Sequence, residues 1–415
     1  MQKTGKSADI QEILRKGDVI SHFQPIVSIK KKSVIGFEAL SRGVTAQAGD
    51  LISPKQLYDA AEGEGLTMEL DRLCRAKAFE SYGATRNNPD RFILTVNLDP
   101  SILNEETVGS NHLRSLAESL GMQPGKVLIE IIESRIRDIE ALKKFVALYR
   151  EYGFLIALDD IGTGLSNLDR VSIIKPDILK IDKSLVQDAA LHYHSGEIVK
   201  SLVSLAHRIG SLVIAEGVET ADQAVIALEL GVDMLQGFYF AKPGPDIHAL
   251  MEGIEPKIEA VAANFKERTV QRINAKKFLH RSYSQIINTL ISELSRIPEE
   301  EYDAALASLI RPHPELECAY ILDEDGIQLS DTVFAADKGG GSKGFFFQPG
   351  NKGTDQSSKD YYFLLAAGLP KFTTAPYISL ASRNVCITIS VAYRDLNFRK
   401  RILCMDIIQD NGIPA

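Results

Sequence analysis

The chain has 415 residues, more than one hydrophobic core usually organises, so we expect two domains, or one barrel with an accessory domain. Apolar residues make up 45% of the sequence and charged residues 25%, values that are ordinary for a globular protein and exclude the disordered and fibrous classes. The formal net charge of −8 disfavours broad electrostatic binding to long nucleic acid, although an acidic cluster can still bind a small anionic ligand through metal ions.

The N-terminal segment, MQKTGKSADIQEILRKG, has no apolar run of the kind found in a signal peptide. No apolar stretch further along the chain is long enough to cross a bilayer. The four cysteines, Cys74, Cys318, Cys386 and Cys404, are widely separated and show no CxxC spacing, as expected of reduced thiols. We therefore expect a cytoplasmic protein without a transmembrane segment.

From about residue 21 to residue 240, short β-rich apolar runs alternate with helical segments, which is typical of parallel βα units. The eight runs are residues 23–29, 34–40, 92–98, 127–132, 155–159, 178–181, 212–216 and 234–240. Only a short KKKS turn separates the first two runs, so one of them should run antiparallel. The pattern predicts an α/β fold, a (β/α)8 TIM-like barrel with one antiparallel strand, within residues 1–253.

A long helical segment follows the barrel. Residues 255–296 contain no internal proline or glycine after Pro256. Apolar residues such as Ile258, Val261 and Phe265 recur at helical spacing. We expect one long helix, or two abutting ones, that forms a linker over residues 254–297.

A second domain is predicted for residues 298–415. Its β-rich runs, at residues 318–323, 344–348, 385–391 and 402–408, predict a small α+β fold around an antiparallel sheet. The stretch KGGGSKG lacks the GxxxxGK[ST] spacing of a phosphate-binding loop, so we interpret it as a turn.

Polar residues stand at the C-terminal ends of the predicted barrel strands, where the βα loops of such a barrel converge. They are Glu38, Asn97, Glu130, Asp159, Asp160, Lys180, Glu216 and Gln236. Burying several carboxylates together is costly unless cations neutralise them, and hard oxygen ligands select Mg²⁺ or Mn²⁺. The adjacent pair Asp159 and Asp160 allows one side chain to bridge two ions while the other binds the second, which predicts a two-metal site for phosphodiester hydrolysis. Lys180 could orient or deprotonate the attacking water, or serve only as a structural partner of the acids.

The motifs in this region resemble the EAL family of cyclic di-GMP phosphodiesterases. They run in family order from Phe23 to Pro245, somewhat more than half of the chain: FQPI, GFEALSR, VNLDP, IEIIES, LDDIGTGLSNL, LKID, IAEGVET and QGFYFAKP. The resemblance implies that the enzyme opens cyclic di-GMP to linear pGpG.

The resemblance also implies roles for individual residues. The ligands it implies for the first ion are Glu38, Asn97, Glu130 and Asp159, and those for the second are Asp159, Asp160 and Glu216. Lys180 would contact the catalytic water, and Glu133 would steady the loop after Asp160. The implied substrate pocket is lined by Gln24, Leu40, Arg42 and Gln236. The guanidinium of Arg42 suits phosphate oxygens, which it can pair bidentately.

Some residues depart from the family pattern. Ile161 and Leu165 replace usual aromatics, Asn167 replaces serine, and Ile132 replaces a common threonine. No metal ligand is lost, but many members of the family bind the nucleotide without cleaving it. The alternatives to an active enzyme are a catalytically silent cyclic di-GMP receptor and a protein-interaction scaffold.

The second domain resembles the Cache group of PAS-like sensor domains through KDYYFLLAAG, FTTAPYIS and VCITIS. The resemblance implies a small-ligand pocket, for which the candidate residues are Tyr361, Tyr362, Thr374, Tyr377, Asp360 and Arg383. The same aromatics could instead form core or dimer packing. Because the linker segment is helical and not a flexible Gly/Ser tract, we expect this domain to regulate the barrel, within a homodimer.

Overall fold

A computed structural model describes residues 9–45, 50–85, 91–132, 135–162, 168–335 and 348–409. The chain divides into two compact units, Met1–Thr269 and Val270–Ala415. Within the described ranges, no helix combines the length and apolar character that a bilayer crossing requires.

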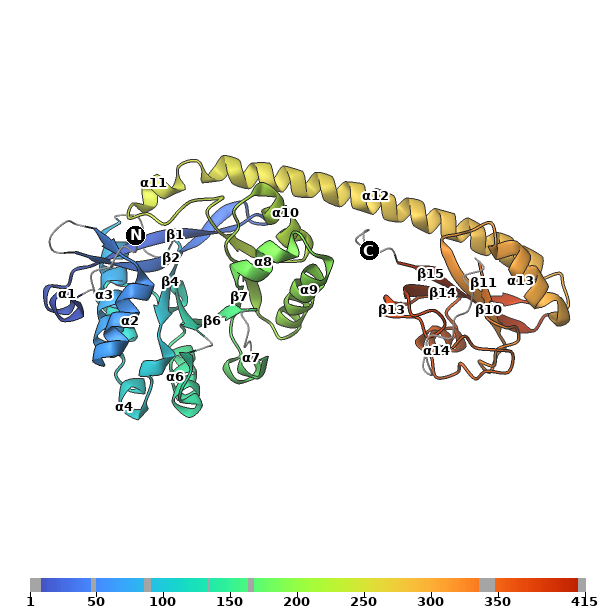
Figure 1. The fold of residues 1–415 in the computed structure, drawn as a ribbon, viewed down its shortest axis with the longest axis horizontal. Coiled ribbons are helices and arrows are strands. Elements are labelled where there is room, and N and C mark those ends of the chain that lie inside the picture. Colours follow the sequence, from blue (N-terminus) through green and yellow to red (C-terminus); the bar gives the residue numbers. More distant parts are fainter. Residues whose placement is uncertain are drawn as a thin grey trace, which may run out of the picture. The chain divides into compact units, whose positions relative to one another are not determined.

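The first unit is built on a sheet that closes into a barrel (Figure 1). Its strands are β1 (Val19–Ser28), β2 (Ser33–Val44), β3 (Leu51–Ile52), β4 (Ile93–Leu98), β5 (Val127–Ile132), β6 (Leu155–Ile161), β7 (Ile178–Ile181), β8 (Leu212–Ala215) and β9 (Met234–Gln236). The order around the ring is β1-β9-β8-β7-β6-β5-β4-β2, and β1 pairs with β2 to close it. Strand β1 runs antiparallel to both neighbours in the ring, whereas the other pairs of the ring, from β2–β4 to β8–β9, are parallel. The short strand β3 pairs antiparallel with β2 outside the ring. The predicted barrel with one antiparallel strand is confirmed.

Helices surround the strands of this unit (Figure 1). They are α1 (Ile10–Lys16), α2 (Pro54–Glu64), α3 (Thr67–Ala84), α4 (Glu105–Val108), α5 (His112–Ser119), α6 (Ile139–Glu151), α7 (Leu168–Ile174), α8 (Lys183–Ala189), α9 (Tyr193–Arg208), α10 (Ala221–Glu229) and α11 (Ile247–Met251). Helix α6 illustrates why they form. The side chain of Asp138 caps its first amide groups, and its buried face carries Leu142, Phe145 and Tyr149. Gly153, at φ 90°, then lets the chain turn into β6.

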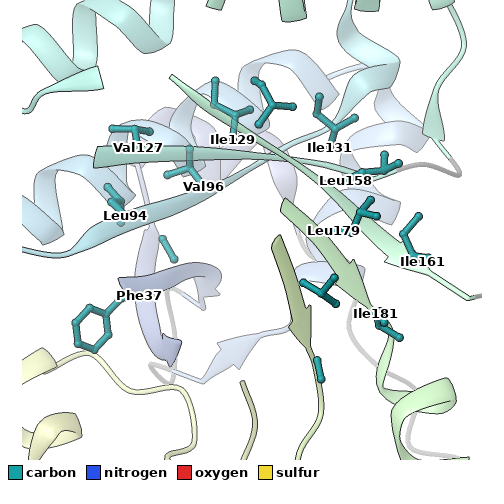
Figure 2. Close-up of a cluster of buried hydrophobic side chains, with 14 of the residues drawn as sticks. Phe37, Leu94, Val96, Val127, Ile129, Ile131, Leu158, Ile161, Leu179 and Ile181 are labelled. Atoms are coloured by element: carbon teal, nitrogen blue, oxygen red, sulfur yellow. The ribbon is translucent and has the colours of Figure 1, made fainter. Parts of the chain in front are cut away.

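The outward-facing strand residues pack against the helices. Because successive side chains of a strand point to opposite faces, Ile129 and Ile131 face outward on either side of Glu130. Figure 2 shows these residues with Val96, Leu158 and Leu179 from neighbouring strands.

The barrel interior contains two layers of side chains. The first layer is apolar and consists of Ile26, Leu128, Ala157, Ile178, Ile214 and Met234. Two positions further along the five parallel strands of this set stand Glu130, Asp159, Lys180, Glu216 and Gln236. Since side chains two residues apart share a face, the second layer is polar and lies at the C-terminal strand ends.

Helix α12 (Ile254–Leu294) is a single continuous helix of 41 residues. Ile258 and Val261, near its start, belong to the hydrophobic core of the first unit. Leu290 and Leu294, near its end, belong to the core of the second. The boundary between the two compact units therefore falls inside a helix and not in a loop.

The second unit contains an antiparallel sheet. Its strands are β10 (Leu316–Leu322), β11 (Val333–Phe334), β12 (Lys371–Thr373), β13 (Tyr377–Ile378), β14 (Val385–Arg394) and β15 (Lys400–Ile408), and its helices are α13 (Tyr302–Ile310) and α14 (Asp360–Ala366). The order is β11-β10-β15-β14-β12, with β13 paired to β14. Three predicted runs correspond to β10, β14 and β15. The glycine-rich stretch 338–344 and most of the run 344–348 lie outside the described residues.

Candidate active site

Lys180 lies at the centre of the polar layer, with 1% of its side chain exposed. Its Nζ is 2.7 Å from Glu130 Oε1 and 2.5 Å from Glu216 Oε1. Two further carboxylates are close, with Glu38 Oε2 at 3.5 Å and Asp159 Oδ1 at 3.6 Å. The structure thus brings together, around one ammonium group, four acids that come from four different strands or strand ends.

Two amide side chains also donate hydrogen bonds to Glu38. Asn97 Nδ2 donates to Glu38 Oε1 at 3.1 Å, and Gln236 Nε2 donates to Glu38 Oε2 at 2.6 Å. Gln236 Nε2 also lies 3.2 Å from the Oε1 acceptor of Gln24, which stands opposite Glu38 in the β1–β2 ladder. Burial would raise the pKa of Glu38, but Lys180 and these amides hold it below its usual value.

The other three carboxylates respond differently, because one ammonium cannot neutralise four acids. Burial, together with the neighbouring acids, raises the pKa of Glu130 well above its usual range. Burial likewise raises the pKa of Asp159, and it raises that of Glu216 to about 8. Burial alone would lower the pKa of Lys180, yet the four acids raise it. The cluster therefore carries an excess of negative charge that protons or cations must offset.

Asp160 sits beside the cluster in an unusual backbone conformation. Its φ is 60°, a left-handed value that costs free energy for a residue other than glycine. The β6–β7 ladder is irregular between Leu158 and Ile161, so the two aspartates occupy a bulge. The amide N–H of Asp160 donates to Asp159 Oδ1 at 2.9 Å. Burial, with Asp159 next to it, raises the pKa of Asp160 to about 6. The bulge turns two consecutive carboxylates towards the same end of the barrel.

The chemistry of the cluster fits divalent cations. Its candidate ligands are all oxygen atoms, which suit Mg²⁺ or Mn²⁺. Both carboxylate oxygens of Glu130 are buried and accept no hydrogen bond, although one is paired by charge with Lys180. As the side chains stand, no three acidic, histidine or cysteine groups of the described ranges are arranged to hold an ion. The acids instead surround the Lys180 ammonium, which supplies the positive charge at this point of the cluster.

A cavity of about 350 Å³ lies next to the cluster. Its lining includes Glu38, Asn97 and the predicted pocket residue Leu40. Arg42 does not line it; Nη1 of this arginine donates to the carbonyl oxygen of Ser41 at 2.8 Å. Gln24 and Gln236 lie in the polar layer and not in the cavity wall.

Helices α2 and α3 and the segment after β5 add lining residues that the sequence analysis missed. Arg75 forms a buried ion pair with Asp71, whose Oδ1 accepts the amide of Asp99 at 3.2 Å. Arg135 pairs with Asp99 at 2.6 Å and lies over the ring of Tyr58. The signal that could have found the first pair is an Asp and an Arg four residues apart on the apolar face of α3.

Three of the residues named in the sequence analysis cannot be placed, and two can. Glu133, Leu165 and Asn167 lie outside the described residues. Of the other two departures from the family pattern, Ile132 lines the cavity and Ile161 packs in the hydrophobic core of the unit.

Comparisons with known proteins identify relatives of the first unit. A family model described as the EAL domain matches residues 7–243. The chain is 32% identical over 237 residues to a probable cyclic di-GMP phosphodiesterase of Escherichia coli, PdeB, a match that covers 57% of this chain and 45% of PdeB. It is 29% identical over 245 residues to the cyclic di-GMP phosphodiesterase RocR of Pseudomonas aeruginosa, covering 59% of this chain and 62% of RocR. The chain thus spans less than half of PdeB and less than two thirds of RocR.

Solved structures extend the comparison. The Bacillus subtilis YkuI protein, crystallised with its substrate c-di-GMP and calcium, superposes with a TM-score of 0.80 at 24% identity, over 97% of this chain and 99% of YkuI. At that identity the likeness shows the fold alone, and it does so over both units. The PaMucR phosphodiesterase in complex with c-di-GMP gives a TM-score of 0.52 at 27% identity, over 58% of this chain and 98% of that structure.

Proposed function

Because the chain belongs to the EAL-domain family, we propose that its first unit hydrolyses one phosphodiester bond of cyclic di-GMP and releases linear pGpG. The observation that carries the proposal is the polar layer itself: four carboxylates surround Lys180 at the C-terminal strand ends, beside a cavity that shares Glu38 and Asn97. The relatives PdeB and RocR, named as cyclic di-GMP phosphodiesterases, support the choice of substrate.

Two divalent cations, Mg²⁺ or Mn²⁺, are part of the proposal. The residues that would hold the first are Glu38, Asn97, Glu130 and Asp159, and those that would hold the second are Asp159, Asp160 and Glu216. Bound ions would supply Lewis-acid stabilisation of the phosphate and lower the pKa of water. The cluster's excess negative charge and the buried oxygens of Glu130, which accept no hydrogen bond, support this assignment.

Lys180 orients the attacking water in this proposal. The surrounding acids raise its pKa, so the side chain remains an ammonium that can donate hydrogen bonds but cannot accept a proton. An ammonium fixed at the centre of the polar layer would hold a water oxygen and disfavour other orientations of that water. Glu133 is proposed to steady the loop after Asp160.

The chain's own side chains would position the nucleotide. Leu40 and the cavity lined by Tyr58 and Arg135 offer apolar, aromatic and cationic contacts for a guanine base. Arg42 stands two residues beyond Leu40 on the same strand face, and its guanidinium suits a phosphate oxygen pair. Gln24 and Gln236 would bind the nucleotide at the inner edge of the pocket.

A silent cyclic di-GMP receptor is the second candidate. The observation that favours it is that Lys180 pairs with all four acids, so the cluster is partly neutralised by a residue of the chain itself. A receptor would bind the nucleotide and leave it intact.

Analysis of the reaction products distinguishes the phosphodiesterase from the silent receptor. Purified full-length protein is incubated with cyclic di-GMP and Mg²⁺ or Mn²⁺, and the nucleotides are separated by chromatography. We expect pGpG from the wild type, none from Glu38→Ala or Asp159→Ala, and retained binding without turnover in Lys180→Ala. Glu259→Ala, at an exposed site on α12, is the control and should match the wild type. Recovery of intact substrate alone with both metals, together with measurable binding, establishes the receptor function instead.

We further propose that the second unit regulates turnover, within a homodimer. Helix α12 supports this, since its two ends are built into the cores of the two units. A change in packing at one end can bias the other, and couplings of about 1–3 kcal/mol change affinity several-fold to a hundred-fold. Sedimentation measurements on the full chain test the dimer.

A further inference from the structure

The second unit contains a cavity of about 870 Å³ on one face of its sheet. Residues from β10, α14, β13 and β15 line it, among them Tyr320, Tyr361, Tyr377 and Asp406. Asp360 and Thr374, which the sequence analysis had singled out, line it as well. A cavity of this size accommodates a metabolite-sized molecule.

The two faces of the sheet differ in character. On the face towards α12 and α13, strands β14 and β15 present Ile389, Leu403, Met405 and Ile407, which are buried in an apolar core. On the opposite face, the same strands present Thr388, Ser390 and Asp406, all buried. Packing alone would favour apolar residues at these positions, so the polar side chains point to another role for this face.

Asp406 is the centre of the polar face, with 3% of its surface exposed. In the strand registers it lies between Cys318 of β10 and Thr388 of β14. Thr388 Oγ1 donates to Asp406 Oδ1 at 2.7 Å. Tyr377 Oη and Ser379 Oγ donate to Oδ2 at 3.3 Å each, distances that leave this oxygen weakly bonded.

None of the cationic side chains that the structure describes neutralises this carboxylate. In the part of the chain that the structure describes, Asp406 forms no ion pair with lysine, arginine or histidine. Burial raises the pKa of Asp406, as expected of an acid held only by hydroxyl groups. At the rim, Asp355 and Asp360 outnumber Lys359, so the lining as a whole is acidic.

We propose that this cavity binds a small organic cation whose ammonium group pairs with Asp406. The ammonium N–H groups donate hydrogen bonds to the weakly bonded Oδ2. The ammonium also supplies the positive charge that no described side chain provides to Asp406. Tyr320, Tyr361 and Tyr377 line the same cavity, and aromatic rings of this kind attract cations. A second ammonium would reach the acidic rim, so diamines should bind more tightly than monoamines.

A matched ligand series tests the proposal on the full-length protein by isothermal titration calorimetry. The probes are putrescine, n-butylamine, n-butanol and butyrate, which share a four-carbon chain and differ in charge. We expect binding of putrescine and, more weakly, of n-butylamine, with none of n-butanol or butyrate. Equal binding of n-butanol, or no amine binding up to about 10 mM, overturns the proposal.

Substitutions locate the site. Asp406→Asn keeps the shape of the side chain and should weaken putrescine binding at least tenfold, while the melting temperature of the ligand-free protein stays the same or rises. That second readout separates a ligand role from a structural one, since loss of a structural carboxylate lowers the melting temperature. Tyr377→Phe removes one hydroxyl donor and keeps the ring, so it should bind putrescine within a few-fold of the wild type. Glu324→Gln, at an exposed turn outside the cavity, is the control. Unchanged putrescine affinity in Asp406→Asn, or a tenfold loss in Tyr377→Phe or Glu324→Gln, contradicts the assignment.

Discussion

The two units bury carboxylates on the face of a sheet and stabilise them in different ways. In the barrel, Glu38, Glu130, Asp159 and Glu216 surround one ammonium, that of Lys180. In the second unit, the described residues give Asp406 no cationic partner, and hydroxyl groups hold its carboxylate. A charge cluster is strongly coupled, so changing one member alters all the others, whereas a single acid with neutral donors can be changed locally. The two units should therefore respond very differently to substitution.

The largest effect is expected from Lys180→Met. Removing the ammonium leaves four buried acids without the cation that they share, and breaking buried ion pairs in this way costs about 3–5 kcal/mol of stability. Turnover should fall by a factor of roughly 10² to 10⁴, as for the loss of a group that acts on the attacking water. Chemical denaturation and the hydrolysis assay measure the two effects.

Lys30→Met is the matched control for that substitution. Lys30 forms a surface ion pair with Asp233 at 2.9 Å, and exposed pairs contribute about 0–1 kcal/mol. Its turnover should equal that of the wild type. Wild-type stability and turnover in Lys180→Met would show that the cluster is not organised around this lysine.

The pH dependence of stability is the second test. Burial raises the pKa of Glu216 from 4.5 to about 8 in the folded state, so the native state binds this proton more tightly than the unfolded state does. The stability that the proton contributes is therefore complete below pH 4.5 and is lost as pH rises through about 8. Without divalent ions, the first unit should lose on the order of 1 kcal/mol per pH unit between about pH 4.5 and about 8, and this decline should level off above pH 8.

Glu216→Gln sharpens the pH test, because the neutral amide has no proton to lose. Thermal unfolding in chelator between about pH 5 and pH 8 should show a shallower decline for the variant than for the wild type. Parallel declines would mean that another group determines the pH dependence.

The smallest effects are expected in the second unit. Thr388→Val removes the short bond to Asp406 and should cost about 1–2 kcal/mol, whereas Ser379→Ala removes a long one and should cost about 0.5 kcal/mol. Denaturant unfolding curves of both variants give the comparison. A loss of several kcal/mol from Ser379→Ala would show that the polar face is as strongly coupled as the barrel cluster.

The barrel could be predicted from the sequence because its strands are continuous apolar runs, each ending in a polar residue. The positions of Glu130, Asp159 and Lys180 followed from this pattern alone, since parallel strand ends converge. What could not be predicted is how the side chains pair. Lys180 and Glu38 are 142 residues apart, and their contact depends on barrel closure and on rotamers. The bulge at Asp159 and Asp160 could not be predicted either, because Asp tolerates a positive φ but does not require one.

The position of Asp406 in the cavity of the second unit could not be predicted from the sequence. The run that became β15 was recognised as a strand, but Asp406 within it gave no sign of which face it would occupy. That depends on the pairing register with β10 and β14, which contacts far along the chain determine. Ion pairs such as Asp71 with Arg75 were missed for a related reason: the polar residues lie on a buried helix face, where composition suggests only packing.

The most direct test of the account is the rate of pGpG formation as a function of Mn²⁺ concentration, measured on full-length protein after chelator treatment. We predict no product in chelator and a saturable increase with Mn²⁺ that disappears in Asp159→Ala. Formation of pGpG at the full rate in chelator, or intact cyclic di-GMP at every Mn²⁺ concentration, would contradict the claim that the barrel's acid cluster is a metal-dependent phosphodiesterase site.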